Sequence, residues 1–180
     1  MIRRVLTWLT DRMQPPRVIY DREGKSPYLS RWALIGSRRM ADGSSPVDQF
    51  GDPKPDAISS PGIHLYLHRF HRSDADGALH SHPWSWAYAL ILAGGYKEER
   101  RFRSRLRPER PYFVYQLTRK PWSVVPIRET DFHRVDLLEH DSWSLFLAGP
   151  KVASWGFWDR NTGEFLPWRE FIAKIRGELS

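Results

Sequence analysis

Two histidines separated by one residue, His80 and His82, are the residues of this sequence best suited to metal chemistry. Side chains on a β-strand alternate between its two faces, so this spacing places both imidazoles on the same face. Neutral imidazoles bind first-row transition metals, and two on one face can share an ion. A third ligand has to come from another segment, and His133 is the best candidate. The pattern predicts a mononuclear metal site held by His80, His82 and His133.

The composition excludes several other kinds of chemistry. The 180 residues include no cysteine, which rules out disulfides, thiolate metal ligands and a cysteine nucleophile. A hydrophobic content of 41% and nine tryptophans indicate a folded protein with one core. No apolar run approaches the ~20 residues that cross a bilayer. Polar residues interrupt the N-terminal apolar stretch too early for a secretory signal, so we predict a cytoplasmic protein with no membrane partner.

The elements that must position the histidines are short, strand-like apolar runs bounded by Gly, Pro, Asp or Asn. They cover residues 28–37, 63–70, 87–93, 96–105, 112–117, 122–126, 133–138, 142–148 and 153–158. Many short strands at this spacing are typical of an all-β sandwich or barrel. Helical periodicity over residues 2–13 and 167–175 predicts flanking N- and C-terminal helices.

The chain is expected to form one domain overall. Residues 1–62 contribute a helix, a short strand and a long loop that pack on a barrel formed by residues 63–158, and residues 159–180 form the C-terminal helix. The loop, residues 40–62, is rich in Gly, Pro, Ser and Asp. It could close over a pocket as a lid, although a solvated connection explains the same composition more simply.

The motifs in the barrel region resemble those of the cupin superfamily. Its first motif reads G-x5-H-x-H-x3,4-E-x6-G, and His80-Ser81-His82 and Gly94 fit this spacing, whereas Ala87 stands in the glutamate position. In the second motif, G-x5-P-x-G-x2-H-x3-N, only His133 is well matched. The resemblance covers residues 63–158 and implies a cupin-type β-barrel or jelly roll.

The resemblance also implies a cofactor and an activity. Many cupins hold a metal with three histidines and one glutamate, and cysteine-dioxygenase-like cupins hold Fe(II) with three histidines alone. We therefore predict one divalent ion, with Fe(II) favoured and Zn, Ni and Mn as alternatives, in a non-haem oxygenase acting on a small molecule. Glu98 or Glu99 could replace the missing carboxylate, although residues just after a glycine turn are more typical of a solvated hairpin flank.

The face of residues 63–70 that carries His64, Tyr66 and His68 would line a pocket if it points into the barrel. The residues predicted to bind substrate are Tyr66, His68, Trp84 and Trp86. Two alternatives stay open: a non-catalytic barrel that binds a small ligand, and an isomerase or epimerase with His68 as the general base. A homodimer formed through a sheet edge or an exposed aromatic face is compatible with this fold.

The net charge of +7 is concentrated between Arg100 and Arg110, where six arginines occur. Alternate arginines on a strand form a stripe that could bind an anionic substrate or nucleic acid. A charged edge strand that prevents aggregation explains the pattern equally well, and we favour that interpretation. No nucleic-acid-binding motif accompanies the stripe, so the expected partner is a small molecule.

Overall fold

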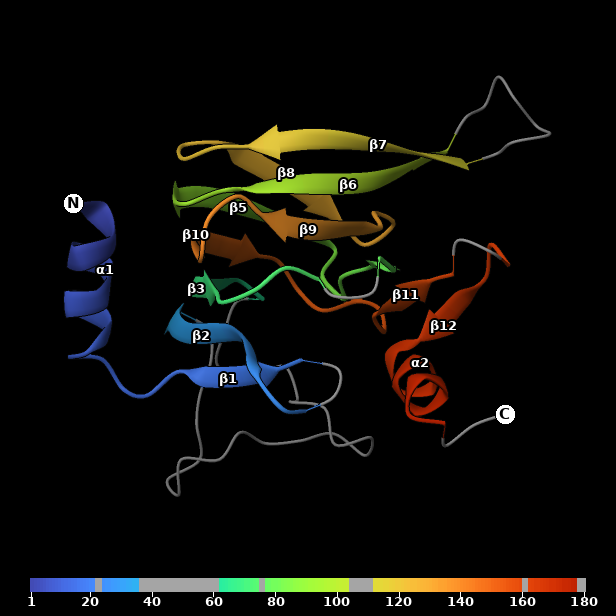
Figure 1. Cartoon of the computed structure of the whole chain (residues 1–180), viewed down its shortest axis with the longest axis horizontal. Coiled ribbons are helices and arrows are strands. Elements are labelled where there is room, and N and C mark those ends of the chain that lie inside the picture. Colours follow the sequence, from blue (N-terminus) through green and yellow to red (C-terminus); the bar gives the residue numbers. More distant parts are fainter. Residues whose placement is uncertain (22–23, 36–61, 75–76, 104–111, 160–161, 178–180) are drawn as a thin grey trace.

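The computed structural model describes residues 1–21, 24–35, 62–74, 77–103, 112–159 and 162–177. Two antiparallel sheets lie face to face, with one helix at each end of the chain (Figure 1). The helices are α1 (Ile2–Thr10) and α2 (Trp168–Ile175). The strands are β1 (Arg17–Tyr20), β2 (Pro27–Ile35), β3 (His64–Phe70), β4 (Leu79–His80), β5 (Trp86–Ala93), β6 (Tyr96–Arg103), β7 (Tyr112–Arg119), β8 (Val124–Arg128), β9 (His133–Leu137), β10 (Ser142–Ala148), β11 (Gly156–Trp158) and β12 (Phe165–Pro167).

Each sheet has six strands. The order in the first sheet is β1-β2-β3-β10-β5-β8, and the order in the second is β12-β11-β4-β9-β6-β7. Gly94 and Gly95, both with positive φ, form the turn that carries the chain from β5 in the first sheet to β6 in the second. This architecture confirms the predicted all-β jelly-roll sandwich with terminal helices. Strands outside residues 63–158 also join the two sheets, namely β1, β2 and β12.

The core lies between the sheets and follows from strand alternation. On β5, the buried residues Ala87, Ala89 and Ile91 point inward, while Tyr88 between them is exposed. On β3, the alternation predicted from the sequence is present, since His64, Tyr66 and His68 are buried together. The inward-facing apolar residues are Tyr66, Trp84, Ala87, Ala89, Ile91, Tyr96, Val125, Ile127, Val135, Phe146 and Ala148.

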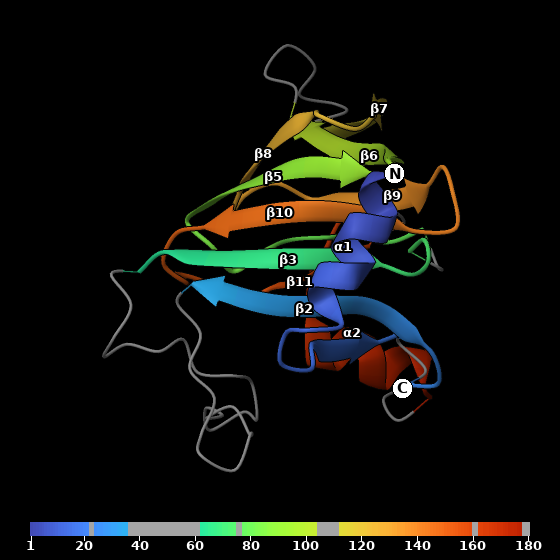
Figure 2. The ribbon, with the colours of Figure 1, turned by 90° about the vertical axis from the view of Figure 1, so that its left-hand side faces the viewer.

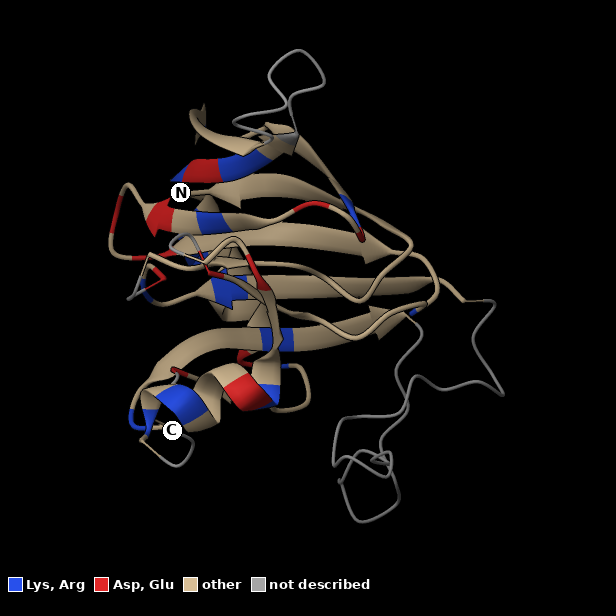
Figure 3. Cartoon of the chain, turned by 90° about the vertical axis from the view of Figure 1, so that its right-hand side faces the viewer, with Lys and Arg blue, Asp and Glu red and all other residues tan. Residues whose placement is uncertain are grey.

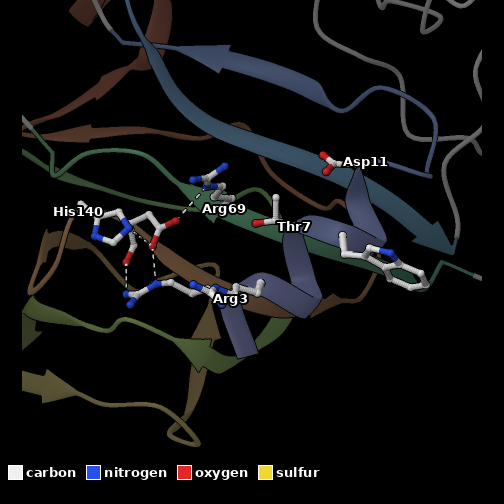
Figure 4. Close-up of a pocket in the computed structure, with 8 residues that line it drawn as sticks. Arg3, Thr7, Asp11, Arg69 and His140 are labelled. Carbon is white, nitrogen blue, oxygen red and sulfur yellow. Dashed lines mark hydrogen bonds and ion pairs between the residues drawn. The ribbon is translucent and has the colours of Figure 1, made fainter. Parts of the chain in front are cut away.

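Helix α1 covers part of the outer face of the first sheet (Figure 2). Its buried residue Leu6 packs against Trp32 and Trp143. Ion pairs hold the N-terminal end of the helix, because Asp141 accepts from Arg3 Nε at 2.8 Å and from Arg69 Nε at 3.0 Å. Figure 4 shows Arg3 and Arg69 among the residues that line a shallow pocket next to these ion pairs. His80, His82 and His133 do not line this pocket.

Helix α2 packs at the opposite end of the sandwich, next to β11. Phe171 stacks on Phe157 with ring centroids 4.1 Å apart, and Trp168 stacks on Trp155 at 5.5 Å. The exposed side of the helix carries both acidic and basic residues (Figure 3). Within the described ranges, no helix is long and apolar enough to cross a membrane.

The interpretation of the arginine run as an edge strand is wrong for its described part. Strand β6 lies between β9 and β7, so it is not an edge. Arg100 is buried, and Arg101 lies over the rings of Phe132 and Tyr112 at 4.0 and 4.4 Å. Three other arginines of the run, Arg105, Arg107 and Arg110, lie outside the described residues, as do residues 40–61 of the predicted loop.

Candidate metal centre

Two strands of the second sheet, β4 and β9, and the segment after β4 bring the predicted histidines together. His80 is the last residue of β4 and pairs directly with His133 on β9. His82 follows two residues later, where Pro83 prevents the strand from continuing. The imidazoles of His80 and His133 therefore share one face of the sheet, and the spacing of two returns His82 to that face.

The nitrogen atoms of the three rings are close enough to bind one ion. One ligand nitrogen from each of His80, His82 and His133 lies within 4.8 Å of the others. His82 Nε2 and His133 Nε2 are 2.8 Å apart. Two nitrogens in neighbouring positions of an octahedral metal, with bonds of about 2.1 Å, are separated by about 3 Å. The donor set and its spacing therefore fit a divalent transition metal.

Glu98 fixes the orientation of His133. Its carboxylate is fully buried, and Oε1 lies 2.6 Å from His133 Nδ1. This contact assigns the proton to Nδ1 and leaves Nε2 available to an ion, which is how carboxylates commonly orient metal-binding histidines. The expectation that Glu98 is a solvated hairpin flank is therefore wrong, because β6 turns this side chain into the sandwich. Glu99 points the other way, and its carboxylate lies 3.9 Å from Arg134.

Two arginines hold the Glu98 carboxylate in turn. Arg100 donates to Oε1 through its terminal nitrogen at 2.7 Å, and Arg119 Nε donates to Oε2 at 2.7 Å. Burial alone would raise the pKa of Glu98, but the hydrogen bond from His133 and the charge of Arg100 outweigh burial and lower it to about 2. Glu98 is therefore a carboxylate at neutral pH, and it accepts the proton that orients His133.

A second carboxylate faces His80. Asp74 Oδ2 lies 3.7 Å from His80 Nδ1 and accepts a hydrogen bond from the backbone of Val135 at 2.7 Å. The separation from His80 is too long for a direct hydrogen bond, but Asp74, like Glu98 beside His133, approaches the Nδ1 atom of the ring. Two of the three imidazoles therefore have a carboxylate near Nδ1.

His82 is held in the form that binds metals. Burial lowers its pKa well below the ordinary histidine value, and the neighbouring His133 and His80 lower it further. A neutral imidazole keeps a lone pair for a metal, whereas an imidazolium does not.

The structure brings three of the four predicted substrate-binding residues to the interior. Tyr66, His68 and Trp84 are buried, and the Tyr66 ring lies 5.8 Å from His68 and 6.3 Å from Trp84. Trp86 lies on the other face of β5, where its ring neighbours Tyr88 at 6.0 Å. Strand alternation separates Trp86 from the histidines, because it differs by one residue from the inward-facing Ala87.

Comparison with known proteins found similarity to solved structures only. No protein-family model matches the chain, and no curated protein matches it. Among solved structures, the chain is similar to KdgF from Halomonas sp., with 15% identity, a TM-score of 0.42, and coverage of 69% of this chain and 80% of that one. It is also similar to Fe(II)-HppE, with 10% identity, a TM-score of 0.45 and coverage of 77% and 56%.

A third similar structure is a cupin superfamily protein from Desulfitobacterium hafniense, with 13% identity, a TM-score of 0.36 and coverage of 52% and 72%. The two-sheet sandwich and the cluster of three histidines described above are those expected from the cupin resemblance of the sequence. The fold is cupin-like.

The cupin glutamate position is occupied by an inward-facing alanine. Ala87 on β5 is 1% exposed and lies in the apolar core, paired with Ile127 and Ala148. The candidate centre of this cupin-like fold is therefore a set of three imidazoles without the cupin glutamate. Sequence reasoning missed the role of Glu98, although its position two residues from the apolar Tyr96 places both on one strand face.

Proposed function

We propose that this protein is a mononuclear metal-dependent enzyme acting on a small molecule, with its ion held by His80, His82 and His133. The observation that carries the proposal is the Glu98–His133 contact beside the imidazole cluster, because a buried carboxylate on Nδ1 presents Nε2 for coordination. Three neutral ligands leave coordination positions for substrate, and we favour Fe(II), which would supply oxygenase chemistry there.

The protein residues around this centre have separable tasks. Glu98 holds the Nδ1 proton of His133 and so keeps that ring in one orientation. Arg100 and Arg119 keep Glu98 ionised and in place. Tyr66 and Trp84 form part of the buried apolar cluster between the sheets, where they would exclude water from a bound substrate.

The test is elemental analysis of protein prepared without a histidine tag. We expect about one iron per chain after anaerobic loading of the wild type, and none in His80→Ala. His140→Ala is the matched control, because His140 is a histidine whose side chain is 73% exposed, and it should retain the metal. The wild type should also consume dioxygen when presented with its substrate from a library of small organic molecules, and His80→Ala should not.

The outcomes separate the alternatives. Stoichiometric zinc or nickel that iron cannot displace would exclude the oxygenase and leave Lewis-acid chemistry. No metal in the wild type, even after loading, would refute the proposal in favour of a ligand-binding barrel. The isomerase alternative gains no support from His68, since its Nε2 lone pair already accepts a hydrogen bond from Arg31 at 2.9 Å. The cytoplasmic location and the homodimer stay predictions.

A further inference from the structure

Arg31 on β2 points into the sandwich, a position that the sequence analysis did not predict. It lies directly opposite His68 in the antiparallel pairing of β2 with β3, and its Nε donates to His68 Nε2 at 2.9 Å. Its guanidinium carbon lies 4.8 Å from the centroid of the Tyr66 ring. The next residue, Trp32, packs on the outer face with Leu6 of α1, which confirms that Arg31 faces inward.

Arg31 differs from four other arginines that the sandwich buries or half-buries, because each of those four binds a carboxylate. Asp141 binds Arg3 and Arg69, while Glu98 binds Arg100 and Arg119. Within the part of the chain that the structure describes, no carboxylate lies within ion-pair distance of Arg31. Its only described hydrogen bond goes to a histidine, and that bond uses Nε. The two terminal nitrogens remain to donate to another group.

Among the described residues, no negative charge compensates the Arg31 cation. Burial, with a smaller contribution from the charge of Arg17, lowers its pKa to about 10. Arg17 lies directly across from it in the pairing of β1 with β2, and like charges in that position are unfavourable. A desolvated cation without an acid is costly, and an anion bound beside it would relieve that cost. The side chain remains partly accessible, so a ligand could reach it.

Arg31 and the histidine cluster face the same interior. The ring of His68 stacks on Phe146 at 4.9 Å, and Phe146 lies 6.0 Å from the ring of His82. A molecule bound to the metal ligands therefore lies on the side of the sandwich that Arg31 faces.

We propose that Arg31 binds the carboxylate of a small organic acid, the substrate whose other end reaches the metal site. This inference rests on the proposed function and adds the substrate class. The NH1 and NH2 groups can hold the two oxygens of a carboxylate side by side, which is the geometry that arginine favours. One guanidinium matches a single negative charge, which favours a carboxylate over a phosphate dianion. Tyr66 and Trp84 would contact the carbon chain of the acid.

The experiment compares acids with their uncharged amides. Hydroxy acids of two to five carbons, from glycolate upward, and the matching hydroxy amides are titrated calorimetrically into zinc-loaded protein, because zinc prevents turnover. We expect the best acid to bind the wild type about 10- to 100-fold more tightly than its amide, as for a charged hydrogen-bonded pair. In Arg31→Gln this preference should fall to about one while the zinc content stays unchanged. Arg4→Gln, which alters an exposed arginine on α1, should keep the full preference.

Each further outcome decides the question. Equal binding of acid and amide by the wild type, or a preference that persists in Arg31→Gln, would overturn the inference. Inorganic phosphate displacing the acids at lower concentration would overturn the carboxylate assignment. If the protein holds no zinc, the proposed function fails, but the same titration of metal-free protein still tests Arg31. If Arg31→Gln does not fold, the binding of acid and amide is compared instead in the wild type and in Arg31→Lys. Lysine retains the positive charge but lacks the two side-by-side guanidinium nitrogens, so the preference for the acid should be weaker than in the wild type, and an unchanged preference would overturn the inference.

Discussion

Replacing Glu98 by glutamine removes one charge from the centre of a buried network and leaves the shape of the side chain nearly unchanged. In the wild type, the carboxylate accepts four hydrogen bonds: two from Arg100 and one from His133 to Oε1, and one from Arg119 to Oε2. A glutamine has one acceptor oxygen. If that oxygen occupies the Oε1 position, its amide group faces the Arg119 Nε donor, 2.7 Å from the original Oε2 position.

The expected loss of stability follows from these contacts. A hydrogen bond to a charged group contributes about 1.5–3 kcal/mol, and removing one partner of a buried ion pair costs about 3–5 kcal/mol. We therefore expect Glu98→Gln to lower the free energy of unfolding by about 3–5 kcal/mol. In a protein of this size, each kcal/mol lowers Tm by about 2–4 °C, so the melting point should fall by about 6–20 °C. Metal affinity should fall about 10- to 100-fold as His133 loses its fixed orientation.

The assay is thermal and urea unfolding of metal-free protein, followed by titration of the metal. Glu99→Gln is the matched control, because Glu99 is the next residue on β6 and its side chain lies on the other face of the strand, with its carboxylate 3.9 Å from Arg134. It should change stability by no more than about 0.5 kcal/mol, as surface substitutions do. A Glu98→Gln protein that melts with the wild type, or that loses no more than Glu99→Gln, would refute the reasoning.

Other substitutions test other parts of the structure. Burial alone would raise the pKa of Asp141, but the hydrogen bond from Trp143 and the charge of Arg69 hold it below its ordinary value. The Asp141 carboxylate therefore stabilises the fold fully above about pH 4, and this stabilisation is lost as the pH falls through the pKa of Asp141 in the folded protein. The difference in urea midpoint between wild type and Asp141→Asn should therefore shrink from pH 7 to pH 3, and a constant difference would contradict this. Gly94→Ala should cost at least about 1–3 kcal/mol, because φ is +74° and the new Cβ would meet the Asp141 carbonyl oxygen at 2.2 Å; an unchanged melting curve would count against the turn. Ile91→Ala, at a fully buried position, should cost about 2–5 kcal/mol in the same assay, and a loss under 1 kcal/mol would argue against the close-packed core.

Local patterns were enough to predict most of the elements. The runs predicted as strands correspond to β2, β3 and β5 to β11, and both helices lie where their apolar periodicity placed them. The strands that were missed, β1, β4 and β12, have four residues or fewer. Such short segments show too few alternations for periodicity to distinguish them from loops.

The histidine site illustrates what the sequence by itself determined. That His80 and His82 share a face follows from the backbone geometry of any extended segment, so their spacing predicted a shared ligand position. Their partners depend on which strands become neighbours. Glu98 reaches His133 over 35 positions, and Arg31 reaches His68 over 37. Sheet order is decided by packing of the whole chain. Only the tertiary structure therefore showed that the buried Glu98 carboxylate orients His133, and that Arg31 faces the same interior with no carboxylate beside it among the described residues.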